Sequence, residues 1–99
     1  MIDPDSELIR LAKAGSKADF GKLVNHYYEM VYAVVYGVVR HHEAARDVTQ
    51  EAFMKAYREL SHFAEQAKFK TWLYRIAFNA AIDHTRQRRP AESLGHLTR

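Results

Sequence analysis

Apolar residues recur at intervals of three and four along most of the chain, the spacing that places them on one face of an α-helix. The first such series, Leu8, Leu11 and Ala12, is short. The segment Asp3–Ser6 before it carries acids and a proline, which suit the first turn of a helix, and Gly15 suits its end. This pattern predicts a short N-terminal helix.

A second apolar series follows a variant capping box, in which Ser16 precedes Asp19 by three residues. Its members share one helical face: Phe20, Leu23, Val24, Tyr27, Val31, Val34, Val35 and Val38. The valines and Gly37 weaken helix propensity toward the end, so a buried strand over Val31–Val39 is the competing interpretation. The unbroken periodicity from Phe20 favours one long helix.

A third helix is predicted from about Glu43 to Leu60, after a break at His41 and His42. Its inner stripe comprises Ala45, Val48, Ala52, Ala56 and Leu60, widened by Phe53 and Tyr57. Its opposite face carries Asp47, Gln50, Glu51, Met54 and Arg58. Because these five positions are spaced by three and four residues, we expect them to form one outward surface.

The stretch Ser61–Lys68 is interpreted as a connecting loop that contains Phe63, and a fourth helix is predicted from about Phe69 to Arg88. The core stripe of this helix is Phe69, Trp72, Leu73, Ile76, Ala77 and Ala80. A second line carries Arg75, Phe78, Asn79, Ile82 and Arg86. Aromatic, amide and guanidinium groups on one face suit stacking on bases and contact with phosphates. The alternative is that Phe78 and Ile82 pack against the first helix.

Composition and charge narrow the class of protein. Four Gly and two Pro are too few for a loop-rich all-β fold, so we predict an all-α fold: a compact helical bundle of three long helices plus a short N-terminal helix. Residues 1–54 hold six Lys or Arg against eight acids, whereas residues 55–99 hold nine against four. This asymmetry suggests two partner surfaces, one of them suited to a polyanion.

Catalytic and metal-binding patterns are weak. The chain has no cysteine, which excludes disulfides and thiolate sites. Glu59 and His62 match half of a di-iron motif that requires a second copy, and the adjacent His41 and His42 would diverge by about 100° on a helix. No glycine-rich phosphate loop or metalloprotease motif occurs. We therefore predict a domain that is not an enzyme, with no catalytic residue, cofactor or metal.

The segment Asp47–Phe53 has the sequence DVTQEAF, and Phe69–Asp83 has the sequence FKTWLYRIAFNAAID, followed by Arg86–Arg89. These two segments resemble region two of extracytoplasmic-function sigma factors, the small promoter-specificity subunits of bacterial RNA polymerase. The N-terminal part is also similar, in Gly15–Phe20 and Glu43–Asp47. The resemblance covers about residues 6–89, and the order and spacing of its two motifs make it specific.

The resemblance implies that the outward face of the third helix docks on the clamp helices, a coiled coil of the polymerase β′ subunit. The matching positions are Asp47, Gln50 and Glu51, with Met54 and Arg58 as neighbours. Carboxylates pair well with arginines of a partner, and methionine gives an adaptable apolar contact. An anti-sigma factor that masks the exposed surfaces is implied as a further partner.

The resemblance also implies that the fourth helix and the loop before it recognise and melt the minus-ten promoter element, holding the non-template strand with one base flipped into a pocket formed by the loop. Phe63 occupies the family's aromatic position in that loop, and Asn79 matches a family asparagine at the DNA surface. The candidate phosphate ligands are Lys68, Lys70, Arg75, Arg86, Arg88 and Arg89. Primary sigma factors wedge the duplex open with paired aromatics near this place, whereas Trp72 stands alone on the core stripe, so we predict a packing role for it.

The resemblance sets the expected domain boundaries. We expect residues 1–89 to form the region-two domain and 90–99 to begin an interdomain linker, with the family's second, minus-thirty-five-binding domain absent from this sequence. The resemblance implies a cytoplasmic promoter-recognition domain. No apolar run approaches the roughly 18 residues of a membrane span, so we expect no membrane insertion. The alternative is a helical protein-interaction module with no DNA role, which leaves Phe63, Asn79 and the basic cluster unexplained.

Overall fold

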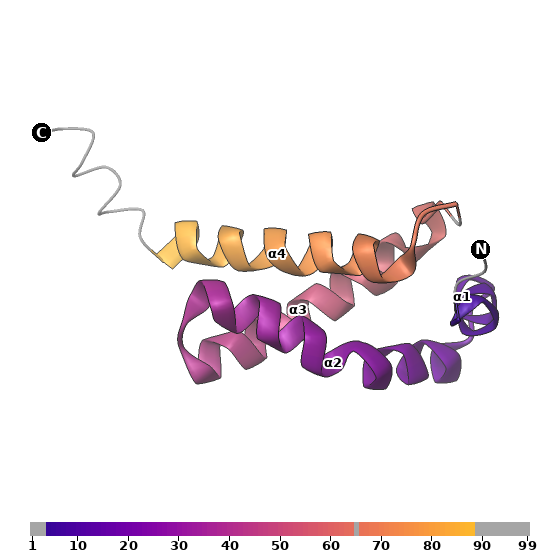
Figure 1. Ribbon diagram of the computed structural model, residues 1–99, viewed down its shortest axis with the longest axis horizontal. Coiled ribbons are helices and arrows are strands. Elements are labelled where there is room, and N and C mark those ends of the chain that lie inside the picture. Colours follow the sequence, from indigo (N-terminus) through magenta and orange to yellow (C-terminus); the bar gives the residue numbers. More distant parts are fainter. Residues whose placement is uncertain (1–3, 65, 89–99) are drawn as a thin grey trace, which may run out of the picture.

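The computed structural model describes residues 4–64 and 66–88, with Arg88 described by its backbone alone, so Arg89 and the predicted linker 90–99 lie outside the described residues. The elements are α1 (Ser6–Lys13), α2 (Lys17–Val39), α3 (His42–Glu59), a 3₁₀ turn η1 (Leu60–His62) and α4 (Phe69–Arg88). No strand occurs in this described part of the chain, and the all-α prediction is confirmed (Figure 1). No helix within it is long and apolar enough to cross a membrane.

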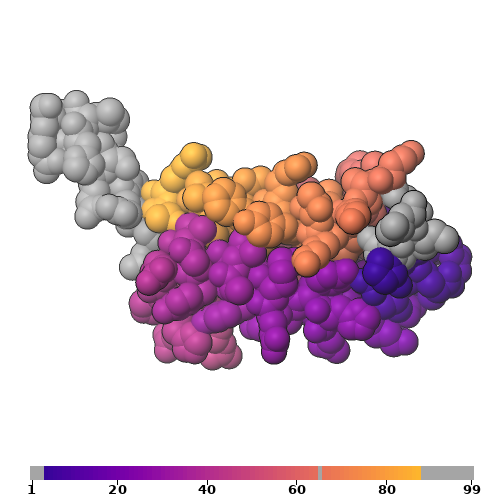
Figure 2. Space-filling view, viewed as in Figure 1, coloured from indigo at the N-terminus to yellow at the C-terminus, as the bar shows by residue number. Residues whose placement is uncertain are grey.

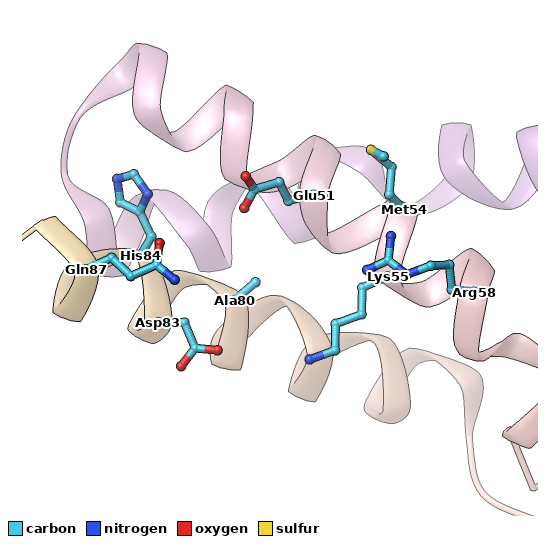
Figure 3. Close-up of a pocket in the computed structure, with 8 residues that line it drawn as sticks. All are labelled: Glu51, Met54, Lys55, Arg58, Ala80, Asp83, His84 and Gln87. Carbon is cyan, nitrogen blue, oxygen red and sulfur yellow. The ribbon is translucent and has the colours of Figure 1, made fainter.

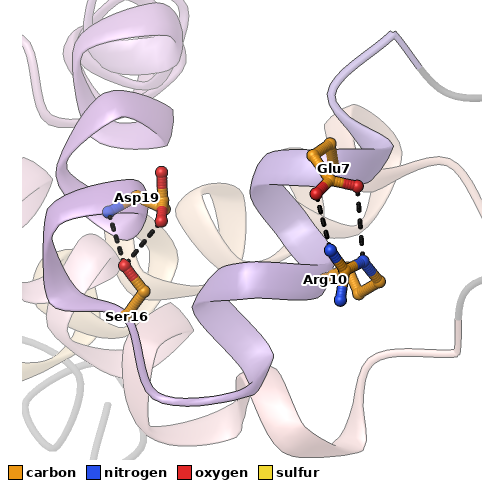
Figure 4. A network of polar contacts seen from close by, with 4 residues as sticks. All are labelled: Glu7, Arg10, Ser16 and Asp19. Carbon is orange, nitrogen blue, oxygen red and sulfur yellow. Dashed lines mark hydrogen bonds and ion pairs between the residues drawn. The ribbon is translucent and has the colours of Figure 1, made fainter.

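The predicted capping box sets the start of α2. The Ser16 hydroxyl oxygen accepts a hydrogen bond from the Asp19 backbone N–H at 3.2 Å and donates one to Asp19 Oδ2 at 2.6 Å (Figure 4). Gly15 precedes it with φ 111°, a left-handed conformation that suits glycine and ends α1. Helix α2 then continues to Val39, so the helical interpretation of Val31–Val39 is confirmed and the strand is excluded.

A left-handed residue and a histidine cap make the turn between α2 and α3. Arg40 has φ 60° and donates its backbone N–H to the Tyr36 carbonyl at 2.8 Å. His41 Nδ1 accepts the Ala44 backbone N–H at 3.2 Å, and α3 begins at His42, one residue earlier than predicted. The chain therefore reverses within three residues, and α2 lies against α3 (Figure 1).

Helices α2, α3 and α4 pack against one another in every pair, while α1 packs on α2 and η1 (Figure 1). Small side chains line the inner faces, since Ala45, Ala52 and Ala56 of α3 and Ala77 and Ala81 of α4 are all fully buried. Alanine lets neighbouring helices approach closely without cavities. The larger buried side chains fill the space between them, and all of these belong to the predicted apolar stripes: Phe20, Leu23, Val31, Val35, Val48, Phe53, Leu60, Phe69, Leu73 and Ile76.

Two predicted core residues, Tyr27 and Trp72, lie at the edge of the core and are only partly buried. Tyr27 donates its hydroxyl to Asp5 Oδ2, while its ring packs 5.6 Å from the Phe69 ring. Trp72 packs against Phe69 at 5.5 Å between ring centroids. Both residues therefore combine an apolar ring contact with partial exposure, as amphipathic aromatics commonly do.

Candidate nucleic-acid and protein interfaces

The outward surface of α4 consists of two ridges that follow the helix at intervals of four residues. The first, which we call the apolar ridge, is Lys70, Tyr74, Phe78, Ile82 and Arg86. The second, the polar ridge, is Thr71, Arg75, Asn79, Asp83 and Gln87. All of these residues are exposed except the half-buried Ile82. Figure 2 shows α4 as an orange-to-yellow band that no other described element covers in this view.

Two aromatic side chains stand out on the apolar ridge. Tyr74 is 49% and Phe78 41% exposed, and their rings lie parallel, 6.5 Å apart with an interplanar angle of 6°. Phe78 does not pack against α1, which contacts α2 and η1 at the far end of the bundle (Figure 1). The alternative that Phe78 packs on the first helix is therefore wrong.

The cations on this surface are available to a ligand. Lys70, Arg75 and Arg86 are exposed, and none of the acids in residues 4–64 and 66–88 forms an ion pair with them. Lys68 is also exposed and stands just before α4, where its carbonyl accepts the Trp72 backbone N–H at 3.1 Å. Of the remaining predicted phosphate ligands, the Arg88 side chain and Arg89 lie outside the described residues.

Phe63 has a different environment from the one expected of an exposed loop aromatic. It follows η1 with extended backbone angles, and its side chain is only 4% exposed. The ring lies 5.0 Å from Trp72 and 5.6 Å from Phe69 between centroids, and Lys13 Nζ donates a hydrogen bond to its carbonyl at 2.9 Å. Phe63 is therefore buried in this cluster, although its neighbours in the segment before α4 are exposed. In this conformation Phe63 is a core residue and its ring offers no free stacking surface.

The same cluster defines the role of Trp72. Its ring is partly buried and leans on both Phe63 and Phe69. A side chain held by two neighbouring rings fits the predicted packing role rather than a free wedge.

The outward face of α3 presents the five residues predicted from the helical spacing, and all of them are exposed: Asp47, Gln50, Glu51, Met54 and Arg58. Met54 is 59% exposed and is the one large apolar side chain of this set. We call this set the α3 face. It differs from the α4 surface in carrying two carboxylates and only one apolar side chain.

A groove lies on each side of the α3 face, and both grooves include Met54 and Arg58. The groove toward α4 has a volume of about 360 Å³ and is lined by Glu51, Met54, Lys55, Arg58, Ala80, Asp83, His84 and Gln87 (Figure 3). The groove toward the start of α2 has a volume of about 440 Å³, and Phe20, Phe53 and Tyr57 supply most of its apolar lining. The α3 face is thus a ridge between a polar and an apolar depression.

Sequence reasoning missed an aromatic column on α2. Tyr28, Tyr32 and Tyr36 stack at successive turns, with centroids 6.5 and 6.0 Å apart, and the Arg40 guanidinium lies 5.9 Å from the Tyr36 ring centroid. Tyr28 also stacks on Phe53 of α3 at 6.2 Å. The spacing of four residues between tyrosines was the available signal, but the adjacent stripe through Tyr27 dominated the pattern.

An exposed ion pair on α1 lowers the pKa of one carboxyl group. Arg10 lies beside Glu7, with Nη2 to Oε2 at 2.6 Å, and this hydrogen bond and charge lower the pKa of the Glu7 carboxyl (Figure 4). The pair is exposed on α1, away from both surfaces. Within residues 4–64 and 66–88, no three His, Asp or Glu side chains gather closely enough to hold a metal ion.

The all-α bundle has a mixed-charge ridge on α3 and a cationic, aromatic surface on α4. These are the features of a macromolecule-binding domain. Comparison with known proteins defines its family: residues 23–91 match the family model for sigma-70 region 2. The chain therefore belongs to the sigma-70 region 2 family, and its relatives place it among the extracytoplasmic-function (ECF) type. Sigma factors act in transcription initiation and are not catalytic, in agreement with the prediction of a non-enzymatic domain.

The relatives agree on this assignment. The chain is 41% identical over 93 residues to the RNA polymerase sigma-H factor of Pseudomonas aeruginosa, covering 92% of this chain and 48% of that protein. It is 40% identical over 91 residues to the ECF sigma-E factor of Escherichia coli, covering 90% and 47%, and 38% identical over 82 residues to SigW of Bacillus subtilis, covering 83% and 44%. The chain thus spans about half the length of the curated relatives it matches.

Two solved structures share the fold. An engineered region 2 of sigmaE, determined by NMR in complex with GTAAAA, has a TM-score of 0.79 and 40% identity, covering 86% of this chain and 90% of that one. CnrH, determined in complex with the cytosolic domain of CnrY, has a TM-score of 0.75 and 28% identity, covering 82% and 53%.

Proposed function

We propose that this chain is the promoter-recognition domain of an ECF sigma factor, which joins the polymerase through α3 and holds the minus-ten element through α4. The observation that carries the proposal is the α4 surface, where exposed cations, an amide and aromatic rings share one uncovered face. The fold relative bound to GTAAAA supports nucleic acid as the ligand of this kind of surface.

The polymerase partner is assigned to the α3 face. Asp47 and Glu51 supply carboxylates for arginines of the β′ clamp helices, and Gln50 adds an amide between them. Met54, at 59% exposed, gives the apolar contact at the centre of such a patch, with Arg58 at its rim. Because the polymerase is a cytoplasmic enzyme, we place the domain in the cytoplasm.

The non-template strand is assigned to α4 and the segment before it. Lys68, Lys70, Arg75 and Arg86 contact phosphates in this proposal, together with Arg88 and Arg89, while Asn79 contacts a base edge. A flipped base is held between the segment 61–68 and Asn79, as in the family pattern. Burial of Phe63 changes its role: it anchors that segment from beneath, through Phe69 and Trp72, and does not stack on the base itself.

An anti-sigma factor is the third proposed partner. The apolar groove beside the α3 face, at about 440 Å³, suits the apolar face of an amphipathic helix. A helix seated there would lie against Met54 and Arg58 and so would compete with the polymerase for the α3 face. The complex of the fold relative CnrH with CnrY supports a partner of this class.

Titration of the 99-residue chain into labelled GTAAAA, a base-scrambled hexanucleotide and the GTAAAA duplex tests the DNA assignment by fluorescence anisotropy. We expect weak binding that favours the single-stranded GTAAAA, since a single domain lacks the avidity of a holoenzyme. Asn79→Ala should reduce the preference for GTAAAA over the scrambled strand by about 5- to 150-fold. Binding to a β′ clamp-helix fragment with no binding to any oligonucleotide would favour the protein-interaction module instead.

A further inference from the structure

A single side chain joins the N-terminal helix to the segment that precedes α4. Lys13 is the last residue of α1, and its Nζ donates a hydrogen bond at 2.9 Å to the carbonyl of Phe63, 50 positions further along the chain. The same ammonium lies 6.0 Å from the centroid of the Phe63 ring. We propose that Lys13 is a positioning residue for base recognition, because it fixes the main chain where the segment assigned to the flipped base begins. This inference rests on the proposed function above.

The main chain at Phe63 has few other attachments. Its N–H donates to the Leu60 carbonyl at 3.0 Å, which closes η1. Phe63 itself is extended, with φ −67° and ψ 124°, so the helical hydrogen bonds end at this residue and its carbonyl accepts the Lys13 ammonium instead. A partly buried carbonyl that loses its donor costs free energy until another donor replaces it. Removal of the ammonium therefore favours movement of this main chain toward water.

The Phe63 ring attaches the same residue to α4. Its centroid lies 5.0 Å from that of Trp72 and 5.6 Å from that of Phe69, and the side chain is 4% exposed. The ring is thus held by α4 and the carbonyl by α1. A residue attached at both its ring and its carbonyl has a fixed orientation, whereas one attached by the ring alone can turn about it. Lys13 supplies the second attachment.

The other end of α1 is also attached to the bundle. Asp5, directly before α1, contacts α2 through both carboxylate oxygens: Oδ1 lies 3.1 Å from His26 Nδ1, and Oδ2 accepts the Tyr27 hydroxyl. The Tyr27 ring in turn packs 5.6 Å from Phe69, in the aromatic cluster beneath the segment. Because α1 is held at its start as well as at its end, Lys13 is a fixed point for the main chain and not a mobile surface cation.

A direct phosphate contact is the competing role for this lysine. Lys13 is half-buried and its ammonium already contacts a carbonyl, whereas the cations assigned to phosphates on α4 are exposed. A phosphate ligand contributes affinity for every sequence and adds to the salt dependence of binding. A positioning residue contributes to the preference between sequences and leaves the salt dependence unchanged. The two roles therefore give different results in the same titration.

The test compares three variants of the 99-residue chain. Lys13→Met keeps an unbranched side chain but removes the ammonium, and Lys13→Arg keeps a charged donor. Lys17→Met is the matched control, since it removes the same charge from an exposed position at the start of α2. Without DNA, Lys13→Met should raise the acrylamide quenching of Trp72, the only tryptophan, at unchanged helicity by circular dichroism. The other two variants should be quenched as the parent is.

Fluorescence anisotropy with single-stranded GTAAAA and its base-scrambled version gives the second readout. The preference for GTAAAA should fall by about fivefold or more in Lys13→Met, the effect of losing one hydrogen bond to a charged group. It should stay at the parent level in Lys17→Met and recover in Lys13→Arg. The slope of log affinity against log salt should not change in Lys13→Met, because no phosphate contact is removed.

Unchanged Trp72 quenching in Lys13→Met overturns the inference, as does an unchanged preference for GTAAAA. Equal losses of preference in Lys13→Arg or in Lys17→Met also overturn it, and a salt slope flattened by about 0.7 in Lys13→Met would make the lysine a phosphate ligand instead. In all of these cases a parent that prefers GTAAAA still upholds the proposed function, whereas a parent without that preference overturns both. Should Lys13→Met lose helicity, Lys13→Gln decides by the same readouts.

Discussion

Helices α3 and α4 bury similar faces and expose very different ones. Each places fully buried alanines against the rest of the bundle. On the outside, α3 (His42–Glu59) carries four acids against three Lys or Arg, whereas α4 (Phe69–Arg88) carries one acid against four. The exposed rings of Tyr74 and Phe78 occupy the middle of α4, whereas α3 exposes Met54 and one ring, Tyr57. The inner faces therefore determine the fold, and the outer faces determine the ligands.

In the proposed function, this difference separates the two ligands by charge. The carboxylates of Asp47 and Glu51 repel a phosphate backbone, so a nucleic acid strand is disfavoured on the α3 face. The uncompensated cations of α4 attract the same strand and offer nothing to a basic partner helix. The proposal therefore assigns a protein to α3 and a polyanion to the neighbouring α4, because each surface disfavours the other's ligand.

The largest expected effect comes from comparing the buried side of α4 with its exposed side. Phe69→Ala removes a ring that is 1% exposed and should lower the free energy of unfolding by about 3–5 kcal/mol. Phe78→Ala removes an exposed ring and should change it by less than about 0.5 kcal/mol. Urea unfolding followed by circular dichroism measures both. A Phe78 variant as unstable as the Phe69 variant would show that the outer ring is structural after all.

Most of the helical framework could be predicted because its signals are local. Ser16 and Asp19 cap α2 as the capping box predicts, and the bounds Phe69 and Arg88 of α4 match the expected ones. The α3 face was also predictable, because spacings of three and four place residues on one surface whatever the tertiary structure.

The segment before α4 could not be predicted in the same way. Burial of Phe63 depends on Phe69 and Trp72 and on a hydrogen bond from Lys13, which is 50 positions away in sequence. Neither the 3₁₀ turn nor the inward direction of that ring follows from local pattern. The same holds for the exposed α4 pair, since only the tertiary structure shows that Phe78 stays 41% exposed among the described residues.

The second prediction tests the protein side of the comparison. Gln50→Ala combined with Glu51→Lys reverses one charge of the α3 face and should weaken binding to a β′ clamp-helix fragment by about tenfold or more. Helicity and GTAAAA binding should stay at the parent level, because both residues are exposed and lie off the α4 ridges. Isothermal titration with each ligand measures the two effects. Undiminished β′ binding would remove the α3 face as the docking surface.

The third prediction tests the electrostatic part of the α4 surface. Lys70→Ala and Arg86→Ala should each weaken binding to single-stranded GTAAAA and its scrambled version alike. Each should also flatten the plot of log affinity against log salt by about 0.7 if it removes one phosphate contact. Lys55→Ala, on α3, is the control and should leave that slope unchanged. Slopes that stay at the parent value in all three variants would place the phosphates elsewhere.

The smallest expected effect concerns a charged pair on neither face. Arg10 lowers the pKa of Glu7 below its ordinary value of 4.5, so the pair stabilises the fold above that value and loses this contribution as pH falls through the folded-state pKa. Glu7→Gln should slightly reduce the fall in thermal midpoint between about pH 6 and about pH 3. Because the pair is exposed on α1 and belongs to neither the α3 face nor the α4 surface, binding of both ligands should be unchanged. Altered β′ or oligonucleotide affinity in this variant would mean that any change of surface charge perturbs binding, and the separation between the α3 and α4 faces would then lose its support.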